Sequence, residues 1–192
     1  MAYLDTSDRI LDASIVLFSQ KGYSEVTTKE IAKEAGVCEM TLFRHFENKR
    51  NLFAQAVEKF VFLPAIKPLF EEYLEWDLEK DLAKISLTYQ ETLKNNHKII
   101  WMEIKNEEFS TDPDGPLFKF PRELKRLLVN YLEKMKERGV VKEDPHTLAV
   151  MFLTTNFGYF MTTLLNHELT KSFDVNSWVA TYTKLLCKAA ML

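Results

Sequence analysis

The sequence predicts an all-α protein of about nine helices. A small N-terminal domain of three helices, with a helix-turn-helix, precedes a larger helical domain. Residues 27–49 hold two short helical patterns around a glycine, and the remaining chain shows apolar residues at helical spacing without sustained strand-type alternation. At 192 residues the chain is long enough for two domains with a sizeable core. We place the domain boundary between residues 47 and 48.

The first predicted helix begins at Thr6 or Ser7 and ends at Gly22, because glycine readily adopts the conformation that terminates a helix. Its inward positions follow the 3.6-residue period of a helix. They are Ile10, Leu11, Ser14, Leu17 and Phe18. One face of this helix is therefore expected to pack against a core.

The second helix is expected to begin at Thr27, whose hydroxyl can cap it while Glu30 bonds back to the cap amide. Gly36 supplies the left-handed conformation that ends this helix, so the chain turns sharply. The third helix, residues 38–46, places Leu42 and Phe46 inward at i and i+4. A second helix after a short turn can lie in the DNA major groove. A generic helical hairpin is the alternative for this segment alone.

Residues 9–60 resemble the N-terminal domain of the TetR family of transcriptional regulators. The resemblance lies in the runs FSQKGYSEVTTKEIAKEAGV and TLFRHFENKRNLF, which include the Lys-Gly-Tyr turn, the Ile-Ala pair and Ala-Gly-Val. The spacing of Phe46 and Lys49 also matches, and Asn48 is expected to cap a fourth helix, residues 49–63. The family implies a DNA-binding domain in residues 1–47 and an effector-binding and dimerisation domain in residues 48–192.

The resemblance implies two sets of DNA-contacting residues. Free amides at a helix N-terminus favour phosphate contacts, and outward side chains of the third helix can contact base edges. The phosphate-contacting set is Thr28, Lys29, His45, Asn48 and Lys49. The base-facing set is Glu39, Met40, Thr41, Phe43 and Arg44. The sequence departs from the family at three positions. The family often has Ser or Thr at Cys38, Gly or Pro at Met40, and Tyr at Phe43, so the operator sequence does not follow from the family.

Charge supports DNA binding only in part. The first 50 residues hold 7 Lys and Arg against 8 Asp and Glu, a local net charge of −1, and the whole chain has a formal net charge of −3. A local basic edge remains where Arg44, His45, Lys49 and Arg50 surround Glu47. A solvated helix end is the alternative interpretation of this cluster. Bound phosphates would still make affinity fall with salt.

The remaining polar residues give no enzyme pattern. The four histidines are dispersed, and no phosphate-binding glycine loop or nucleophile elbow is present. We therefore expect no catalytic residue, no metal and no cofactor. Cys38 and Cys187 lie far apart, and acidic residues interrupt the N-terminal region, so a reduced cytoplasmic protein is expected. Cys38 at a helix N-terminus could be a redox switch, although a small residue filling a cap position is the simpler interpretation.

The second domain is expected to be helical throughout. Pro64 and Pro68 are expected to break the fourth helix or kink its exit, residues 77–81 to form a charged connection, and residues 110–116 a loop. Expected helices cover residues 82–95, 98–109, 122–138, 147–167 and 176–191.

Residues 147–167 contain no Lys, Arg, Asp or Glu over twenty-one positions. A membrane span is one interpretation, but threonines and asparagines interrupt the run, so a helix buried on most sides is expected, with no membrane partner. One face can pack in its own domain and another requires a partner. The helix over residues 147–167 and the last helix, contributed by each of two chains, would form a four-helix interface in a homodimer. The family also places its dimer contact there. The expected contact residues are Phe157, Met161, Leu164, Trp178, Tyr182, Leu185, Leu186 and Ala189.

Aromatic and thioether residues of this domain suggest an effector pocket, although most of them are expected to be core. An apolar or aromatic ligand is expected, with Asn156 or a threonine to orient it. Glu103 and Glu107 could attract a cation, but a solvated face is the simpler interpretation. The candidate pocket residues are Tyr89, Trp101, Met102, Phe109, Phe118, Phe152, Asn156 and Phe160.

The sequence thus predicts a ligand-responsive transcriptional regulator. Repression is the expected default, through a dimer that binds a palindromic double-stranded DNA operator and is released by a small, largely apolar molecule. Two alternatives stay open. One is a helical ligand-binding protein or enzyme that retains the hairpin as scaffold. The other is a DNA-binding protein without a small-molecule effector.

Overall fold

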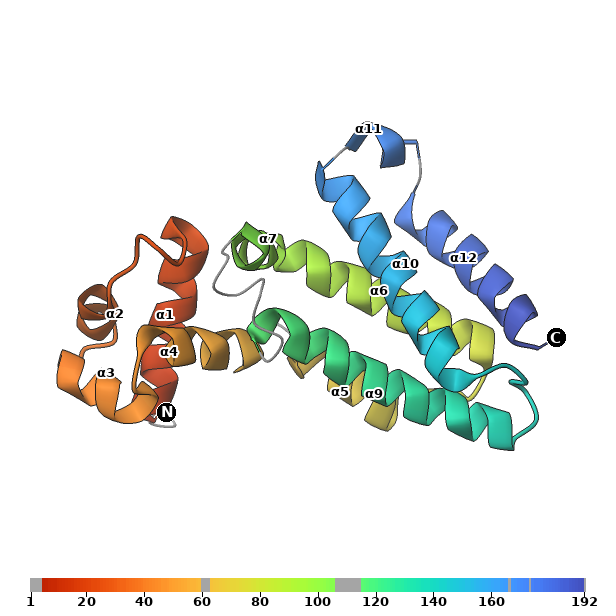
Figure 1. Cartoon of the computed structure of the whole chain (residues 1–192), viewed down its shortest axis with the longest axis horizontal. Helices are drawn as coiled ribbons and strands as arrows, with labels where there is room; N and C mark the ends of the chain where they lie inside the picture. Colours follow the sequence, from red (N-terminus) through yellow and green to blue (C-terminus); the bar gives the residue numbers. More distant parts are fainter. Residues whose placement is uncertain (1–4, 60–62, 106–114, 166, 173, 192) are drawn as a thin grey trace. The chain divides into compact units, whose positions relative to one another are not determined.

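The computed structural model describes residues 5–59, 63–105, 115–165, 167–172 and 174–191. All eleven elements formed by these residues are helices (Figure 1). The all-α prediction is therefore confirmed, and the expected number of about nine is exceeded because short helices form at Leu63–Glu72 and His167–Thr170. The chain divides into two compact units, residues 1–64 with 96–120 and residues 65–95 with 121–192.

Unit 1 holds the helix-turn-helix. Its helices are α1 (Thr6–Lys21), α2 (Thr28–Glu34), α3 (Glu39–Phe46), α4 (Lys49–Val57), α7 (His97–Lys105) and the first residues of α9 (Pro116–Glu137). Phe18, Tyr23 and Phe53 join α1, the following turn and α4, with ring centroids 5.1 to 5.5 Å apart. Helix α1 also contacts α2, α3 and α7, so it is the central helix of this unit.

Unit 2 contains α5 (Leu63–Glu72), α6 (Leu78–Asn95), most of α9, α10 (Pro145–Leu165), α11 (His167–Thr170) and α12 (Val175–Ala190). Helix α6 contacts both α10 and α12. Tyr131 of α9 donates a hydrogen bond to the buried carboxylate of Asp81 on α6 at 2.8 Å. These contacts place the core of unit 2 around α6.

Helix α10 corresponds to the uncharged run. By length and composition it is the one helix of the described residues that could cross a membrane. Of the 18-residue window that meets this test, 28% is buried inside the chain. Core helices pass the same test, and α10 buries Asn156 and Phe152 in unit 2. One face of α10 packs on α6 and α12, as expected, and the burial of its other face by a partner stays a prediction.

Three element boundaries differ from the sequence predictions. Pro68 lies inside α5 and does not break it. Helix α6 begins at Leu78, because Asp77 accepts a hydrogen bond from the Lys80 amide and so shortens the expected connection. Helix α9 begins at Pro116, and it includes Pro121 in its first turns.

Candidate nucleic-acid interface

The start of α2 is fixed by a reciprocal cap. The Glu30 amide donates to the Thr27 hydroxyl at 3.2 Å, and the Thr27 amide donates to the Glu30 carboxylate at 2.9 Å. This amide, with Lys21 at 3.0 Å, lowers the pKa of Glu30 to about 2. The capping box predicted from the sequence is confirmed. It leaves the first amides of α2 pointing away from the helix, where an anion can bind them.

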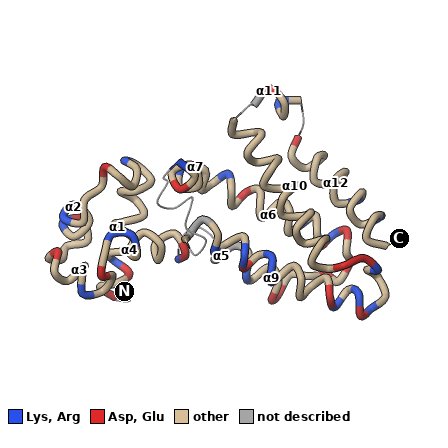
Figure 2. Tube along the Cα trace, viewed as in Figure 1, with Lys and Arg blue, Asp and Glu red and all other residues tan. Residues whose placement is uncertain are grey.

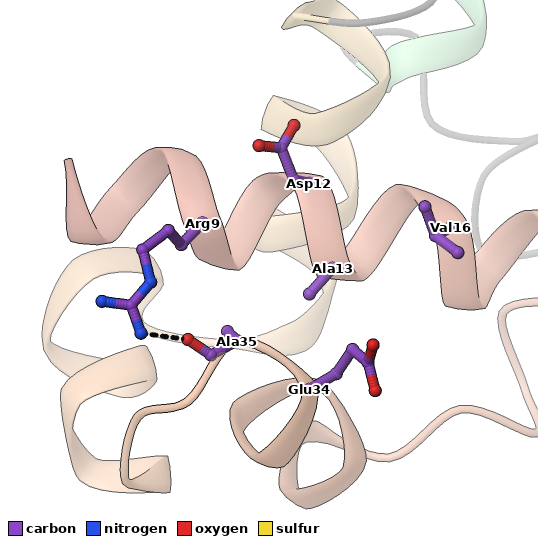
Figure 3. A pocket seen from close by; sticks show the side chains of 6 residues that line it. All are labelled: Arg9, Asp12, Ala13, Val16, Glu34 and Ala35. Carbon is purple, nitrogen blue, oxygen red and sulfur yellow. Dashed lines mark hydrogen bonds between the residues drawn. The ribbon is translucent and has the colours of Figure 1, made fainter. Parts of the chain in front are cut away.

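The turn between α2 and α3 is held by Arg9 of α1. Its guanidinium donates to the Ala35 carbonyl oxygen at 2.5 Å and to the Gly36 carbonyl oxygen at 3.2 Å (Figure 3). Gly36 has a φ of +66°, and a Cβ atom there would lie 2.9 Å from the Arg9 guanidinium. Glycine is thus required both by the backbone conformation and by the close approach of Arg9.

Helix α3 buries one face and exposes the other. Leu42 and Phe46 are fully buried, as predicted, while Met40 is 80% exposed and Phe43 and Arg44 are also exposed. The exposed side chains leave α3 with an outward face that can enter a groove.

Two members of the predicted base-facing set are half-buried and have partners in the protein. The Thr28 hydroxyl donates to the Glu39 carboxylate at 2.5 Å. The Thr41 hydroxyl lies 3.1 Å from the Cys38 sulfur. This contact is the main cause that lowers the pKa of the exposed Cys38 thiol. The fully exposed part of the predicted base-facing set is therefore Met40, Phe43 and Arg44.

The predicted phosphate-contacting residues lie at two places in unit 1. Thr28 and Lys29 form the first turn of α2, and His45, Asn48 and Lys49 flank the turn between α3 and α4. Asn48 also caps α4, since its side chain accepts from the Asn51 amide at 2.8 Å, and the Lys49 ammonium lies 4.3 Å from the Tyr23 ring centroid. Basic and acidic residues are interspersed along α1 to α4 (Figure 2), so close contacts, and not net charge, would direct DNA here.

Sequence reasoning did not predict a surface pocket that lies beside the turn between α2 and α3. It measures about 310 Å³ and lies between α1 and the end of α2 (Figure 3). Its lining residues are Arg9, Asp12, Ala13, Val16, Glu34 and Ala35. No motif in the sequence signals this pocket, because it arises from the packing of two helices.

The predicted effector-pocket residues are divided between the two units. Trp101 and Met102 on α7 and Phe118 on α9 belong to unit 1, where the Met102 sulfur accepts a hydrogen bond from the Tyr23 amide at 2.8 Å. The members in unit 2 are buried on α6 and α10, and they are Tyr89, Phe152, Asn156 and Phe160. Phe109 lies outside the described residues.

Asn156 is part of a buried polar network in unit 2. Its side-chain oxygen accepts from the Ser86 hydroxyl at 2.5 Å and from the Gln90 amide at 3.1 Å. Its amide nitrogen donates to the Phe152 carbonyl oxygen at 2.9 Å. The Asn156 oxygen thus has two partners from α6, so the network joins α6 and α10.

Glu103 of α7 does not lie on a solvated face, which was the simpler expectation from the sequence. It is 0% exposed, because it shares the buried face of α7 with Ile99 and Ile100. Burial raises its pKa to about 8. Its position has no clear signal in the sequence, since Lys98 and Lys105 make the same short helix polar on several sides.

The predicted dimer-contact residues lie on α10 and α12. Most are half-buried or exposed, and Trp178 stacks between Tyr159 at 4.1 Å and Tyr182 at 5.2 Å. Leu185 is 61% exposed, whereas Leu186 is 6% exposed and packs within its own unit. Leu186 is therefore corrected to a core residue, because the helical period turns it about 100° away from Leu185.

The chain thus presents a helix-turn-helix with an exposed second helix, joined to a helical unit, which defines the class of DNA-binding transcriptional regulators. Residues 10–56 match the family described as "Bacterial regulatory proteins, tetR family". The chain is 36% identical over 159 residues to the HTH-type transcriptional regulator YvkB of Bacillus subtilis (strain 168), covering 81% of this chain and 82% of that protein. It belongs to the TetR family, which consists of DNA-binding regulators and not of enzymes.

One further relative supports the family, and one solved structure supports the fold. IcaR of Staphylococcus aureus (strain Newman), the HTH-type negative transcriptional regulator of the biofilm operon icaADBC, is 26% identical over 149 residues, covering 76% of this chain and 79% of that protein. The fatty acid degradation regulator FadR from Bacillus halodurans has a similar fold, with a TM-score of 0.70, 20% identity and 97% of each chain covered. The predicted family and fold class are confirmed.

Proposed function

We propose that this TetR-family regulator is a cytoplasmic repressor that binds a palindromic operator as a homodimer. The observation that carries the proposal is the exposed face of α3, held at its N-terminal end by the Arg9 contacts to the α2–α3 turn. A recognition helix held in one orientation loses little conformational entropy when it enters the major groove. The negative regulator IcaR, a relative of this chain, supports repression over activation.

In the proposed complex, residues 1–47 bind DNA and residues 48–192 bind the effector and the second chain. Lys29, His45 and Asn48 are exposed, which suits them for contacts to phosphates, and Thr28 and Lys49 lie beside them. Met40, Phe43 and Arg44 face the bases, and Arg44 can make a bidentate bond to guanine. Glu39 and Thr41 also belong to this surface.

The second chain is proposed to pack on α10 and α12. The exposed and half-buried apolar side chains there, from Val150 and Met151 on α10 to Leu185 on α12 and Met191 directly after it, support an interface of this kind. Binding to successive major grooves requires two copies of α3 about 34 to 36 Å apart, so the proposal needs a pair of chains with twofold symmetry.

A small, largely apolar or aromatic effector is proposed to release the operator. A hundredfold change in operator affinity requires only about 2.7 kcal/mol of coupling between the two sites. Tyr89, Trp101, Met102, Phe118, Phe152, Asn156 and Phe160 remain the candidate residues.

Selection from a pool of random duplexes tests the proposal, because such a pool contains every short palindrome that could be the operator. We expect the native protein to enrich a palindrome, and its affinity to fall with salt with a log–log slope of about −0.9 per phosphate contact. Enrichment of no sequence at low salt would exclude sequence-specific DNA binding. A helical ligand-binding protein that keeps the hairpin as scaffold would give this result.

A further inference from the structure

The buried carboxylate of Glu103 has no partner in the part of the chain that the structure describes. Its side chain is 0% exposed, and neither carboxylate oxygen makes a hydrogen bond. A buried carboxylate without a partner is costly, and native proteins rarely keep one without a functional reason.

The charged side chains of α1, and those at the described ends of α4 and α9, pair with other residues or line another site. On α1, the helix that packs against α7, Asp8 pairs with Lys59 and Lys21 pairs with Glu30. The two remaining charged groups of α1, Arg9 and Asp12, line the surface pocket at the end of α2. The described ends of α4 and α9 contribute the pair Glu58 and Lys119, at 3.1 Å. No cation of the described residues thus neutralises Glu103.

The surroundings of Glu103 on α7 are apolar. Ile99 and Ile100, one turn earlier on the same face, are buried, and Trp101 and Met102 are half-buried. The residues His97, Lys98 and Lys105 of α7 are exposed, and the Lys105 ammonium lies 4.8 Å from the Trp101 ring centroid. A group that contacts Glu103 therefore meets hydrocarbon beside one carboxyl group, which becomes an anion when its proton leaves.

We infer that Glu103 is the anionic contact for the effector, which is a monovalent organic cation with apolar or aromatic substituents. The inference rests on the proposed effector response and makes its ligand class more specific. A metal ion does not fit, because Zn²⁺ and Ca²⁺ require several protein ligands. The described residues contain no group of three His, Cys, Asp or Glu that could supply them. A delocalised or quaternary cation loses little hydration on burial and needs only one counter-charge.

Binding of such a cation is coupled to proton release. Because the pKa of Glu103 is raised to about 8, the carboxyl group carries its proton at neutral pH. The proton leaves to the buffer when the cation binds. Affinity is therefore expected to rise about tenfold per pH unit between about pH 6 and 7, and to level off above about pH 8.

The test uses tetraphenylphosphonium and tetraphenylborate, which share size and shape but have opposite charge. Calorimetric titration of the full-length protein should show binding of tetraphenylphosphonium at least tenfold tighter than that of tetraphenylborate. Glu103→Gln keeps the shape of the side chain and should weaken the phosphonium at least tenfold. Glu91→Gln, an exposed position on α6, is the matched control and should leave binding unchanged.

Three outcomes would overturn the inference: no phosphonium binding, equal binding by Glu103→Gln, or equal binding of the borate. The last outcome would instead indicate an apolar site that does not discriminate the charge of its ligand. Operator binding by the same samples without ligand is measured in parallel. If the native protein bound no specific duplex, the proposed function would be contradicted. If it bound a specific duplex but no phosphonium, only the assignment of Glu103 would be contradicted.

Discussion

The hydroxyl of Thr28 donates a 2.5 Å hydrogen bond to the carboxylate of Glu39, so the first residue of α2 is joined to the first residue of α3. The sequence predicts a DNA contact for both residues, to phosphates for Thr28 and to bases for Glu39. The bond shows that each also fixes the position of the other. The two ends of the predicted DNA surface are therefore coupled within the free protein.

A double-mutant cycle tests this coupling. Thr28→Val and Glu39→Ala should each lower the free energy of unfolding by about 1 kcal/mol, because each removes the same half-buried hydrogen bond. The double variant should cost no more than either single change. Urea denaturation provides the values. Additive losses would mean that the two side chains do not interact in solution.

Gly36→Ala should destabilise the protein by roughly 1 to 2 kcal/mol from its positive φ alone, and by more because the new methyl group meets Arg9. Gly139→Ala is the matched control, since Gly139 has a φ of +75° but open space around its Cβ position. Thermal unfolding compares the two variants. An equal loss at both positions would show that the Arg9 contact does not constrain the turn.

Leu185→Glu should convert the proposed dimer to monomers, because it places a charge within an apolar interface. Leu169→Glu on α11 is the control, since Leu169 is 64% exposed and lies outside the proposed contact. Sedimentation velocity distinguishes the two species. A Leu185→Glu protein that still sediments as a dimer would exclude this face of α12.

The unfolding free energy should depend on pH through Glu103. Its pKa is about 8 in the folded protein and near the ordinary value of 4.5 when unfolded, so the folded state binds the proton more tightly. Stability from this group is fully present below pH 4.5 and is lost as the pH rises through 8. The loss is about 1.4 kcal/mol per pH unit in that window. Glu103→Gln should lack this part of the pH dependence, as urea titrations at several pH values would show. Parallel curves for both proteins would contradict the burial of a titrating carboxyl group.

Local signals allowed much of unit 1 to be predicted. The cap at Thr27, the turn at Gly36 and the inward pair Leu42 and Phe46 depend on residues close in sequence, and the structure places them as expected. Arg9 was not predicted as a contact of the turn, because it lies 26 residues before Ala35. Such long-range contacts leave no periodic pattern.

The larger unit was predicted less completely. Leu185 and Leu186 were both assigned to one interface stripe, but they differ by their rotation about α12, and Leu186 is buried in its own unit. Pro68 was expected to break the fourth helix or kink its exit, but it lies inside α5. In unit 1, Glu103 was expected in solvent because acidic residues usually are, and only packing around α7 reveals its burial.

The measurement that tests the central claim most directly is duplex selection with native protein and Arg44→Ala in parallel. We predict that the native protein enriches a palindrome. The variant should lose preference at one base position in each half-site, with a discrimination loss of about 1 to 3 kcal/mol, while the other positions stay unchanged. If Arg44→Ala enriched the same palindrome with the same preference at every position, the assignment of the exposed face of α3 to base contacts would be contradicted.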